Sequence, residues 1–168
     1  MLESLITSKT RLRLLIKFFL NIANEGYLNS LANEFGESTN SIRKELNNLS
    51  SSGYLEKYNE NNKVIYRANV SHPLFNIIQK IVQKHVGIEE ILETICNRTG
   101  DVKKIIILGD YAKGIDSGLI EILIVGKNIN KAYLNKIAPK IESKIKRKVS
   151  FFISDKSLKQ ESLIIFEA

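Results

Sequence analysis

Apolar residues recur every three or four positions along the first fifty residues, and this spacing places them on one face of a helix. Ser8 can cap a first helix that runs to about Ile22, and Gly36 can end a short second helix. Ser38 can cap a third helix, which Gly53 would close. The pattern therefore predicts three helices before Gly53.

After Gly53 the period changes from helical spacing to simple alternation, which is typical of a strand with one buried face. Residues 54–58 supply the natural partner strand, and the polar loop 59–62 between them is rich in residues that tolerate a positive φ. The segment is predicted to be a β-hairpin, and its second strand buries Val64, Tyr66, Ala68 and Val70.

Pro73 marks a boundary, because the residue before a proline is disfavoured in a helix and proline itself suits a helix start. Residues 71–99 are predicted to be a helical connector that is interrupted at Gly87. Its apolar stripe is wider than one neighbouring helix would cover, which favours a domain junction or a dimer contact. The residues expected in a contact between two chains are Leu74, Ile78, Ile81 and Val82.

Residues 100–168 combine short apolar runs of strand length with one amphipathic helix. Strands are predicted at 102–108, 119–125, 149–153 and 163–166, and Asn130 can cap a helix that follows the second strand. The result is a small mixed sheet with helices on one face. The whole chain is therefore expected to be α/β, of the α+β type, with domains at 1–70 and 100–168 on either side of the connector.

The composition excludes several classes of protein. Of 168 residues, 43% are hydrophobic and 26% charged, which excludes collagen-like, disordered and disulfide-scaffold classes. No apolar run approaches the roughly 20 residues needed to cross a bilayer, so we expect no membrane partner. A single Cys96 forms no intrachain disulfide and is expected to be a small buried hydrophobe, in a cytoplasmic, reducing compartment. His85 is likewise expected to pack in the core.

The net charge of +7 makes an anionic partner plausible, and its distribution is uneven. Residues 100–168 carry 13 lysines and arginines against 8 acids. This excess is compatible with a solvated helix face or with a phosphate-binding surface. Much of it is contributed by Lys136, Lys140, Lys144, Lys146, Arg147 and Lys148.

The outward positions of the third helix carry the side chains that read DNA. Arginine forms paired hydrogen bonds to guanine, asparagine pairs with adenine, and lysine, serine and threonine bind phosphate. With the hairpin that follows, this stretch resembles the winged helix-turn-helix domain of bacterial transcriptional regulators, in particular the arsenic-repressor type. The resemblance implies that the third helix enters the major groove through Ser38, Thr39, Asn40, Ser41, Arg43, Lys44 and Asn47.

In that family the hairpin tip contacts the DNA backbone or the minor groove, which implies a role for Asn61, Asn62 and Lys63. With one cysteine, the chain lacks the thiolate ligands of the family's metal-sensing site, so no metal is expected. A three-helix bundle with a solvated third helix, or a winged domain that contacts protein, remains an alternative.

The segment from Gly109 to Gly126 resembles the minimal nucleotidyltransferase family, whose motif is Gly-Ser after one strand, a further glycine, and Asp-x-Asp at the start of the next strand. The paired aspartates hold Mg²⁺ for phosphoryl transfer. Gly109 and Gly114 match that motif, but Asp110 stands in place of the serine. With Lys113 and Glu121, these residues make up a degenerate nucleotide site.

The metal positions of that motif are also changed. Leu119 and Glu121 stand where the two aspartates belong, and the third carboxylate would fall near Ser150, which is not an acid. Leucine cannot bind a hard cation, and an anionic Asp110 would repel a triphosphate. We therefore expect no catalysis and no cofactor, although a metal site built from Asp110, Asp116 and Glu121 is an alternative.

Taken together, these features predict a sequence-specific DNA-binding transcriptional regulator. Its partner is double-stranded DNA, it forms a homodimer, and its inactive C-terminal domain is a sensor or assembly surface for a nucleotide or protein effector. Two alternatives remain open: an active nucleotidyltransferase with a winged-helix docking domain, and an antitoxin-like protein-binding partner.

Overall fold

A computed structural model describes residues 2–156 and 162–168, and it has the mixed α and β composition that the sequence predicts. The chain divides into two compact units, Met1–Val82 and Gln83–Ala168. This division falls inside the predicted connector. Within the described residues, no helix is long and apolar enough to cross a membrane.

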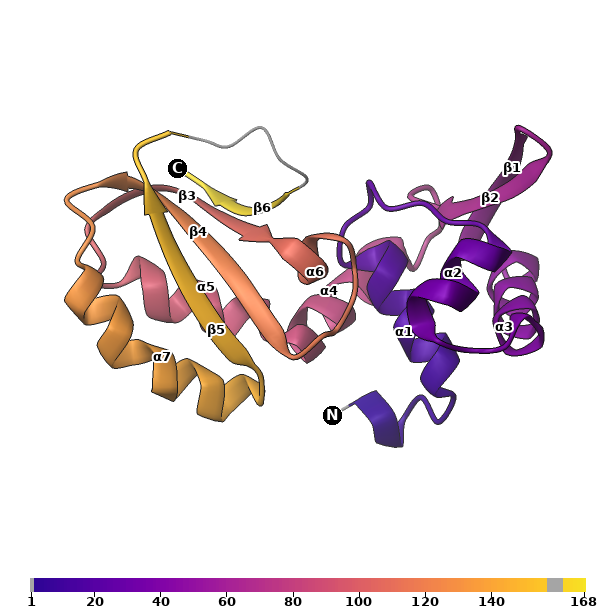
Figure 1. The fold of residues 1–168 in the computed structure, drawn as a ribbon, viewed down its shortest axis with the longest axis horizontal. Coiled ribbons are helices and arrows are strands. Elements are labelled where there is room, and N and C mark those ends of the chain that lie inside the picture. Colours follow the sequence, from indigo (N-terminus) through magenta and orange to yellow (C-terminus); the bar gives the residue numbers. More distant parts are fainter. Residues whose placement is uncertain (1, 157–161) are drawn as a thin grey trace. The chain divides into compact units, whose positions relative to one another are not determined.

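The N-terminal unit contains the three predicted helices and the hairpin (Figure 1). Ser8 and Ser38 cap their helices as expected, since each side chain accepts a hydrogen bond from the backbone N–H three residues later. The elements are η1 (Leu2–Ser4), α1 (Lys9–Phe19), α2 (Leu28–Phe35), α3 (Thr39–Ser51), β1 (Leu55–Glu60) and β2 (Lys63–Ala68).

Helix α1 ends at Phe19, three residues before the predicted end. Two asparagines explain the difference, because their side chains bind the backbone groups that a longer helix would use. Asn24 Nδ2 donates to the carbonyl of Lys17 at 2.9 Å, and Asn21 Oδ1 accepts from the N–H of Ala23 at 3.1 Å. The chain therefore leaves the helix before Ile22, which is 51% exposed.

The hairpin is longer and its loop tighter than predicted. Glu60 pairs with Lys63, so the loop contains only Asn61 and Asn62, with φ angles of 48° and 59°. Two successive positive φ angles are the mark of the turn that matches the twist of a hairpin. The predicted burial of Val64 and Val70 is wrong, because these side chains are 41% and 55% exposed and Val70 lies beyond the end of β2.

Helix α4 (Phe75–Val86) begins two residues after Pro73, and α5 (Ile88–Cys96) follows Gly87. Leu74, Ile77 and Ile81 form an exposed apolar stripe on and just before α4, with exposures of 42%, 54% and 40%. The expectation that Val82 faces a second chain is wrong, because it is only 1% exposed within its own chain. Ile78, also expected in that contact, is half-buried, and Ile77 is exposed in its place.

Cys96 also departs from expectation: as the last residue of α5 it is exposed, not buried. Burial of part of its side chain raises the pKa of the thiol.

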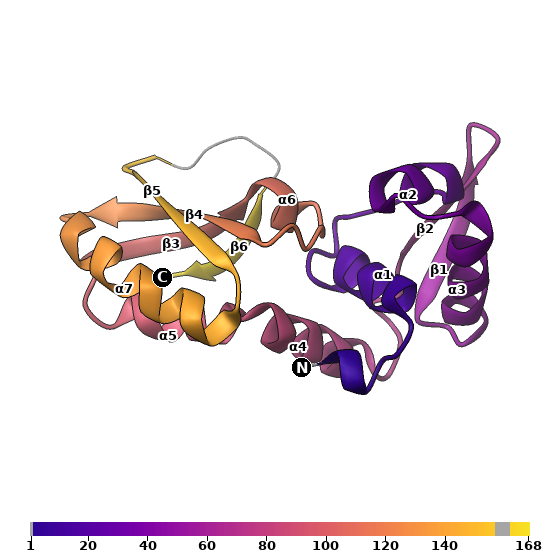
Figure 2. The ribbon, with the colours of Figure 1, turned by 60° about the horizontal axis from the view of Figure 1, so that its bottom comes forward.

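The C-terminal unit is a four-stranded mixed sheet with the strand order β5-β4-β3-β6. Strands β4 and β5 are parallel, and the other pairs are antiparallel. Helices α5 and α7 cover one face of this sheet (Figures 1 and 2). The elements after α5 are β3 (Asp101–Leu108), α6 (Gly109–Ala112), β4 (Leu119–Lys127), α7 (Lys131–Ile145), β5 (Lys148–Ser154) and β6 (Leu163–Glu167).

The two central strands supply the core of this unit. Ile105 and Ile107 on β3 pair with Ile124 and Ile122 on β4, and all four are fully buried. Helix α7 continues through Pro139, as its apolar positions on both sides of the proline predict. Pro139 is exposed, so the backbone carbonyl that loses its helical partner lies on the outer side of the helix.

Candidate functional site

All seven residues predicted to read DNA lie at the N-cap or on the exposed face of α3. Ser38 and Ser41 bind each other, with 3.0 Å between their hydroxyl oxygens, so both help to start the helix. Arg43 Nη1 donates to Asn40 Oδ1 at 3.3 Å, which directs the guanidinium along the helix surface. The remaining exposed side chains of the set are Thr39, Lys44 and Asn47.

The inner face of α3 carries an unexpected carboxylate. Glu45 is 6% exposed and binds α1, where Ser8 Oγ donates to Oε1 at 2.9 Å and Arg11 Nε donates to Oε2 at 2.8 Å. Burial alone would raise the pKa of Glu45, but the hydrogen bonds from Arg11 and Ser8 outweigh it and lower the pKa. The pair of helices is therefore joined by a charged contact at the N-terminus of α1.

A cleft of about 340 Å³ separates α3 from the hairpin. It brings together four of the predicted residues: Arg43 and Asn47 from α3, and Asn62 and Lys63 from the hairpin. No acid is among the residues described as lining it. With Asn29, which also lines it, the cleft therefore combines two cations and three amides, a set that binds phosphates and base edges. Ser38, Thr39, Asn40, Ser41, Lys44 and Asn61 lie outside it.

Sequence reasoning missed the aromatic wall of this cleft. Tyr27 lines it, and Lys63 Nζ lies 4.2 Å from the centroid of the Tyr27 ring. Gly26, the residue before Tyr27, is bound to the hairpin by hydrogen bonds in both directions with the backbone of Tyr66. The Ser30 hydroxyl accepts a hydrogen bond from the Tyr27 N–H at 3.1 Å. The three-residue spacing of this capping box is the feature of the sequence that could have placed Tyr27 at the start of α2.

The degenerate nucleotide site is only partly assembled. Gly109 adopts a positive φ of 61° at the end of β3, and Glu121 pairs across the sheet with Leu108. A Cβ at Gly109 would collide with Glu121 Oε2, so this carboxylate lies directly against the glycine backbone. Asp110 and Lys113 are exposed on and after the short helix α6.

The other positions of that motif lie at the start of β4, on β5 and in the turn after α6. Leu119 is 45% exposed at the start of β4, and Ser150 pairs with Glu121 in the sheet. Gly114 is buried with a φ of 75°. Across residues 2–156 and 162–168, no group of three or more histidine, cysteine, aspartate or glutamate side chains is placed to hold a metal ion.

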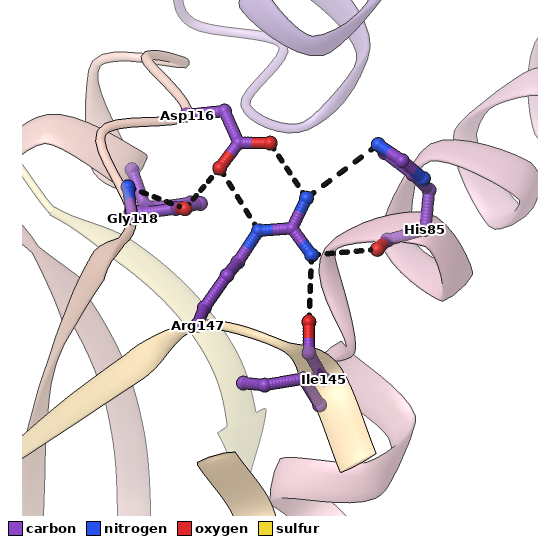
Figure 3. A network of polar contacts seen from close by, with 6 residues as sticks. His85, Asp116, Gly118, Ile145 and Arg147 are labelled. Atoms are coloured by element: carbon purple, nitrogen blue, oxygen red, sulfur yellow. Dashed lines mark hydrogen bonds and ion pairs between the residues drawn. The ribbon is translucent and has the colours of Figure 1, made fainter. Parts of the chain in front are cut away.

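Asp116, the third acid of the alternative metal site, belongs to a different network (Figure 3). Arg147 binds both of its oxygens, with Nε donating to Oδ1 at 2.9 Å and Nη2 donating to Oδ2 at 2.6 Å. The Tyr111 hydroxyl also donates to Oδ1. Burial would raise the pKa of Asp116, but its bonds to Arg147 and Tyr111 lower it, so the carboxylate stays ionised.

The same network ties α4 to the sheet within the C-terminal unit. Arg147 Nη1 donates to the backbone carbonyls of His85 and Ile145, each at 3.0 Å. His85 is buried, as predicted, but it also faces the guanidinium, with 3.5 Å between Nε2 and Nη2. The network therefore fixes the end of α4, and it engages Asp116 in a structural contact.

Comparison with protein-family models, curated proteins and solved structures finds no match to this chain.

The Glu45 contact yields a test of stability. Replacing Glu45 by Gln removes a charged acceptor from Arg11, so the N-terminal unit should lose about 1 to 3 kcal/mol of unfolding free energy near neutral pH. The folded-state pKa of Glu45 is lowered, so its stabilisation is present above the ordinary value of 4.5 and is lost as pH falls through the folded value. The loss caused by Glu45→Gln should therefore shrink in acid.

Urea unfolding of the wild-type chain and the variant at neutral and acidic pH measures this effect. Glu60→Gln is the control, because it removes an exposed carboxylate from the same unit and should change stability by less than about 0.5 kcal/mol. Equal stability of Glu45→Gln and wild type at neutral pH would contradict the role given to this contact.

Proposed function

We propose that this chain is a sequence-specific DNA-binding transcriptional regulator. The observation that carries the proposal is the cleft between α3 and the hairpin, where Arg43, Asn47, Asn62 and Lys63 come together with no acid among the lining residues. The exposed polar face of α3 supports the same function, as does the position of α3 directly before the hairpin in the chain.

In this proposal α3 enters the major groove with its N-terminal half toward the base edges. Arg43 and Asn47 are the side chains suited to base recognition, because both can form paired hydrogen bonds with a base. Lys63 and the two asparagines at the hairpin tip bind the sugar-phosphate backbone. The Tyr27 ring beneath Lys63 orients the ammonium group. A cytoplasmic location is part of the proposal.

The C-terminal unit is proposed to bind or assemble without catalysing nucleotide transfer. Leu119 and Ser150 supply no carboxylate where the reaction needs one, and Glu121 lies against Gly109. Its proposed role is that of a sensor for a nucleotide or protein effector.

We further propose that two chains dimerise through the exposed stripe of Leu74, Ile77 and Ile81. A two-fold dimer matches an operator with two related half-sites, because each chain then contacts one of them.

Base recognition by α3 and backbone contact by the hairpin predict different effects of mutation on DNA binding. Arg43→Ala should cost about 1 to 3 kcal/mol of specific binding and relax the base preference at one position. Lys63→Ala should weaken binding to all sequences alike. Fluorescence anisotropy with a selected DNA site and a random duplex measures both effects.

Lys57→Ala is the matched control, since it removes one exposed hairpin charge outside the cleft. It should leave the affinity for both the selected site and the random duplex unchanged. If Arg43→Ala weakened specific and random DNA equally, α3 would not be the reading helix.

The dimer proposal is tested by Ile81→Asp. This change puts a charge into the apolar stripe, so the variant should sediment as a monomer with its helical content intact and bind the selected site poorly. Ile22→Asp, at another exposed isoleucine, should sediment like wild type. A monomeric wild-type chain at micromolar concentration would refute the proposal.

The proposed lack of catalysis is tested with labelled ATP, CTP, GTP and UTP, in the presence of Mg²⁺ or Mn²⁺ and cell extract. No labelled product should form above background, and Glu121→Gln should leave DNA binding unchanged. Labelling that disappears in Glu121→Gln would instead identify an active nucleotidyltransferase.

A further inference from the structure

The outer face of α7 carries a row of lysines. Lys136, Lys140 and Lys144 are all exposed and follow one another at intervals of four residues, about 6 Å along the helix axis. The opposite face of the helix is buried through Leu134, Ile137, Ile141 and Ile145. We call the three exposed residues the α7 lysine row.

No acid in the described part of the chain forms an ion pair with this row. Glu142 is the single acid of α7, and its carboxylate accepts from Lys148 at 3.0 Å and from the N–H of Val149 at 3.0 Å. Arg147, just beyond the helix, is paired with Asp116. No acid among the described residues of the C-terminal unit therefore neutralises the charge of the row.

The row does not serve the stability of the helix. Like charges four residues apart repel each other, which opposes helix formation. The helix dipole favours a cation only in the last turn, and this accounts for Lys144 but not for Lys136 or Lys140. A bound anion would remove this repulsion.

The surface is hollowed at the C-terminal end of α7. A hollow of about 400 Å³ at the end of α7 is lined by Pro139, Ser143, Lys146 and Lys148, and also by one acid, Glu142, which is paired with Lys148. Ser143 adds a hydroxyl donor, and Lys146 extends the positive charge beyond the helix. Lys146 is therefore one further cation near the C-terminal end of the α7 lysine row, whose own lysines do not line the hollow.

We propose that the α7 lysine row binds the phosphate backbone of nucleic acid without reading its sequence. The apolar stripe of α7 is buried, and the small exposed residues Ala132, Pro139 and Ser143 offer no apolar anchor for a lipid surface. An interface for an acidic protein would need an apolar centre, which this face also lacks. A duplex carries one charge per ~1.7 Å of its axis, so a row of cations on one side of a helix meets phosphates in any register.

This role is separate from base recognition by α3, and it is tested in the full chain. The variant Lys136→Gln/Lys140→Gln/Lys144→Gln removes the row, and its matched control Lys103→Gln/Lys127→Gln/Lys156→Gln removes three exposed lysines located off α7. Lys146 is retained in both, because it holds a positive φ of 57°. The probe is a short DNA duplex of random sequence, and affinity is measured as a function of salt.

The slope of log affinity against log salt falls by about 0.9 for each phosphate that the protein no longer neutralises. The row variant should lose about 2 to 3 units of slope and about tenfold or more of affinity at low salt, while its thermal midpoint is unchanged or higher. The control should keep the wild-type slope. Introducing Arg43→Ala into both chains should leave the difference between them intact.

Equal slopes for the row variant and its control would overturn the inference, whereas the proposed function of α3 would stand. A wild-type chain that binds the random duplex but shows no preference for any sequence would contradict the proposed function, and a slope lowered only in the row variant would still support the inference. Tighter binding of the row to phosphatidylserine vesicles than to the duplex, abolished in the row variant, would assign it to a membrane surface instead.

Discussion

The exposed face of α3 depends on a charge buried on its other side. An isolated carboxylate at the position of Glu45 would be costly, because burial removes its hydration. Ser8 and Arg11 of α1 replace that hydration with two hydrogen bonds, and Ser8 also caps α1. One contact thus fixes where α1 begins and how α3 is oriented on it. The polar face of α3 is turned outward because Glu45, Ile42 and the apolar residues of α3 are turned inward.

In the C-terminal unit, too, a carboxylate is held by hydrogen bonds from a distant segment of the chain. Asp116 and Arg147 are joined by two hydrogen bonds, and Tyr111 and His85 complete the network. Two carboxylates near the degenerate nucleotide site are held by the fold, since Asp116 binds Arg147 and Glu121 lies against Gly109, whereas Asp110 is exposed. This unit offers charge on the outside of α7, which is why we assign it a role in binding.

Periodicity predicted most helices and strands, because burial of one face dominates their sequence pattern. It did not predict the end of α1, where two asparagine side chains compete for the backbone, or the exact hairpin loop. Of the candidate site, the polar face of α3 and the hairpin tip were found from residue type. Tyr27 and the partner of Glu45 were not, because each depends on a contact between segments distant in the sequence.

The central claim is that this chain recognises particular DNA sequences through α3. The most direct measurement is to incubate the purified full chain with fragments of its own genomic DNA, recover the retained fragments and sequence them. The claim predicts enrichment of a small set that shares one short motif, and loss of that enrichment in Arg43→Ala. Retention of no fragment at low salt, or retention without any shared motif, would contradict it.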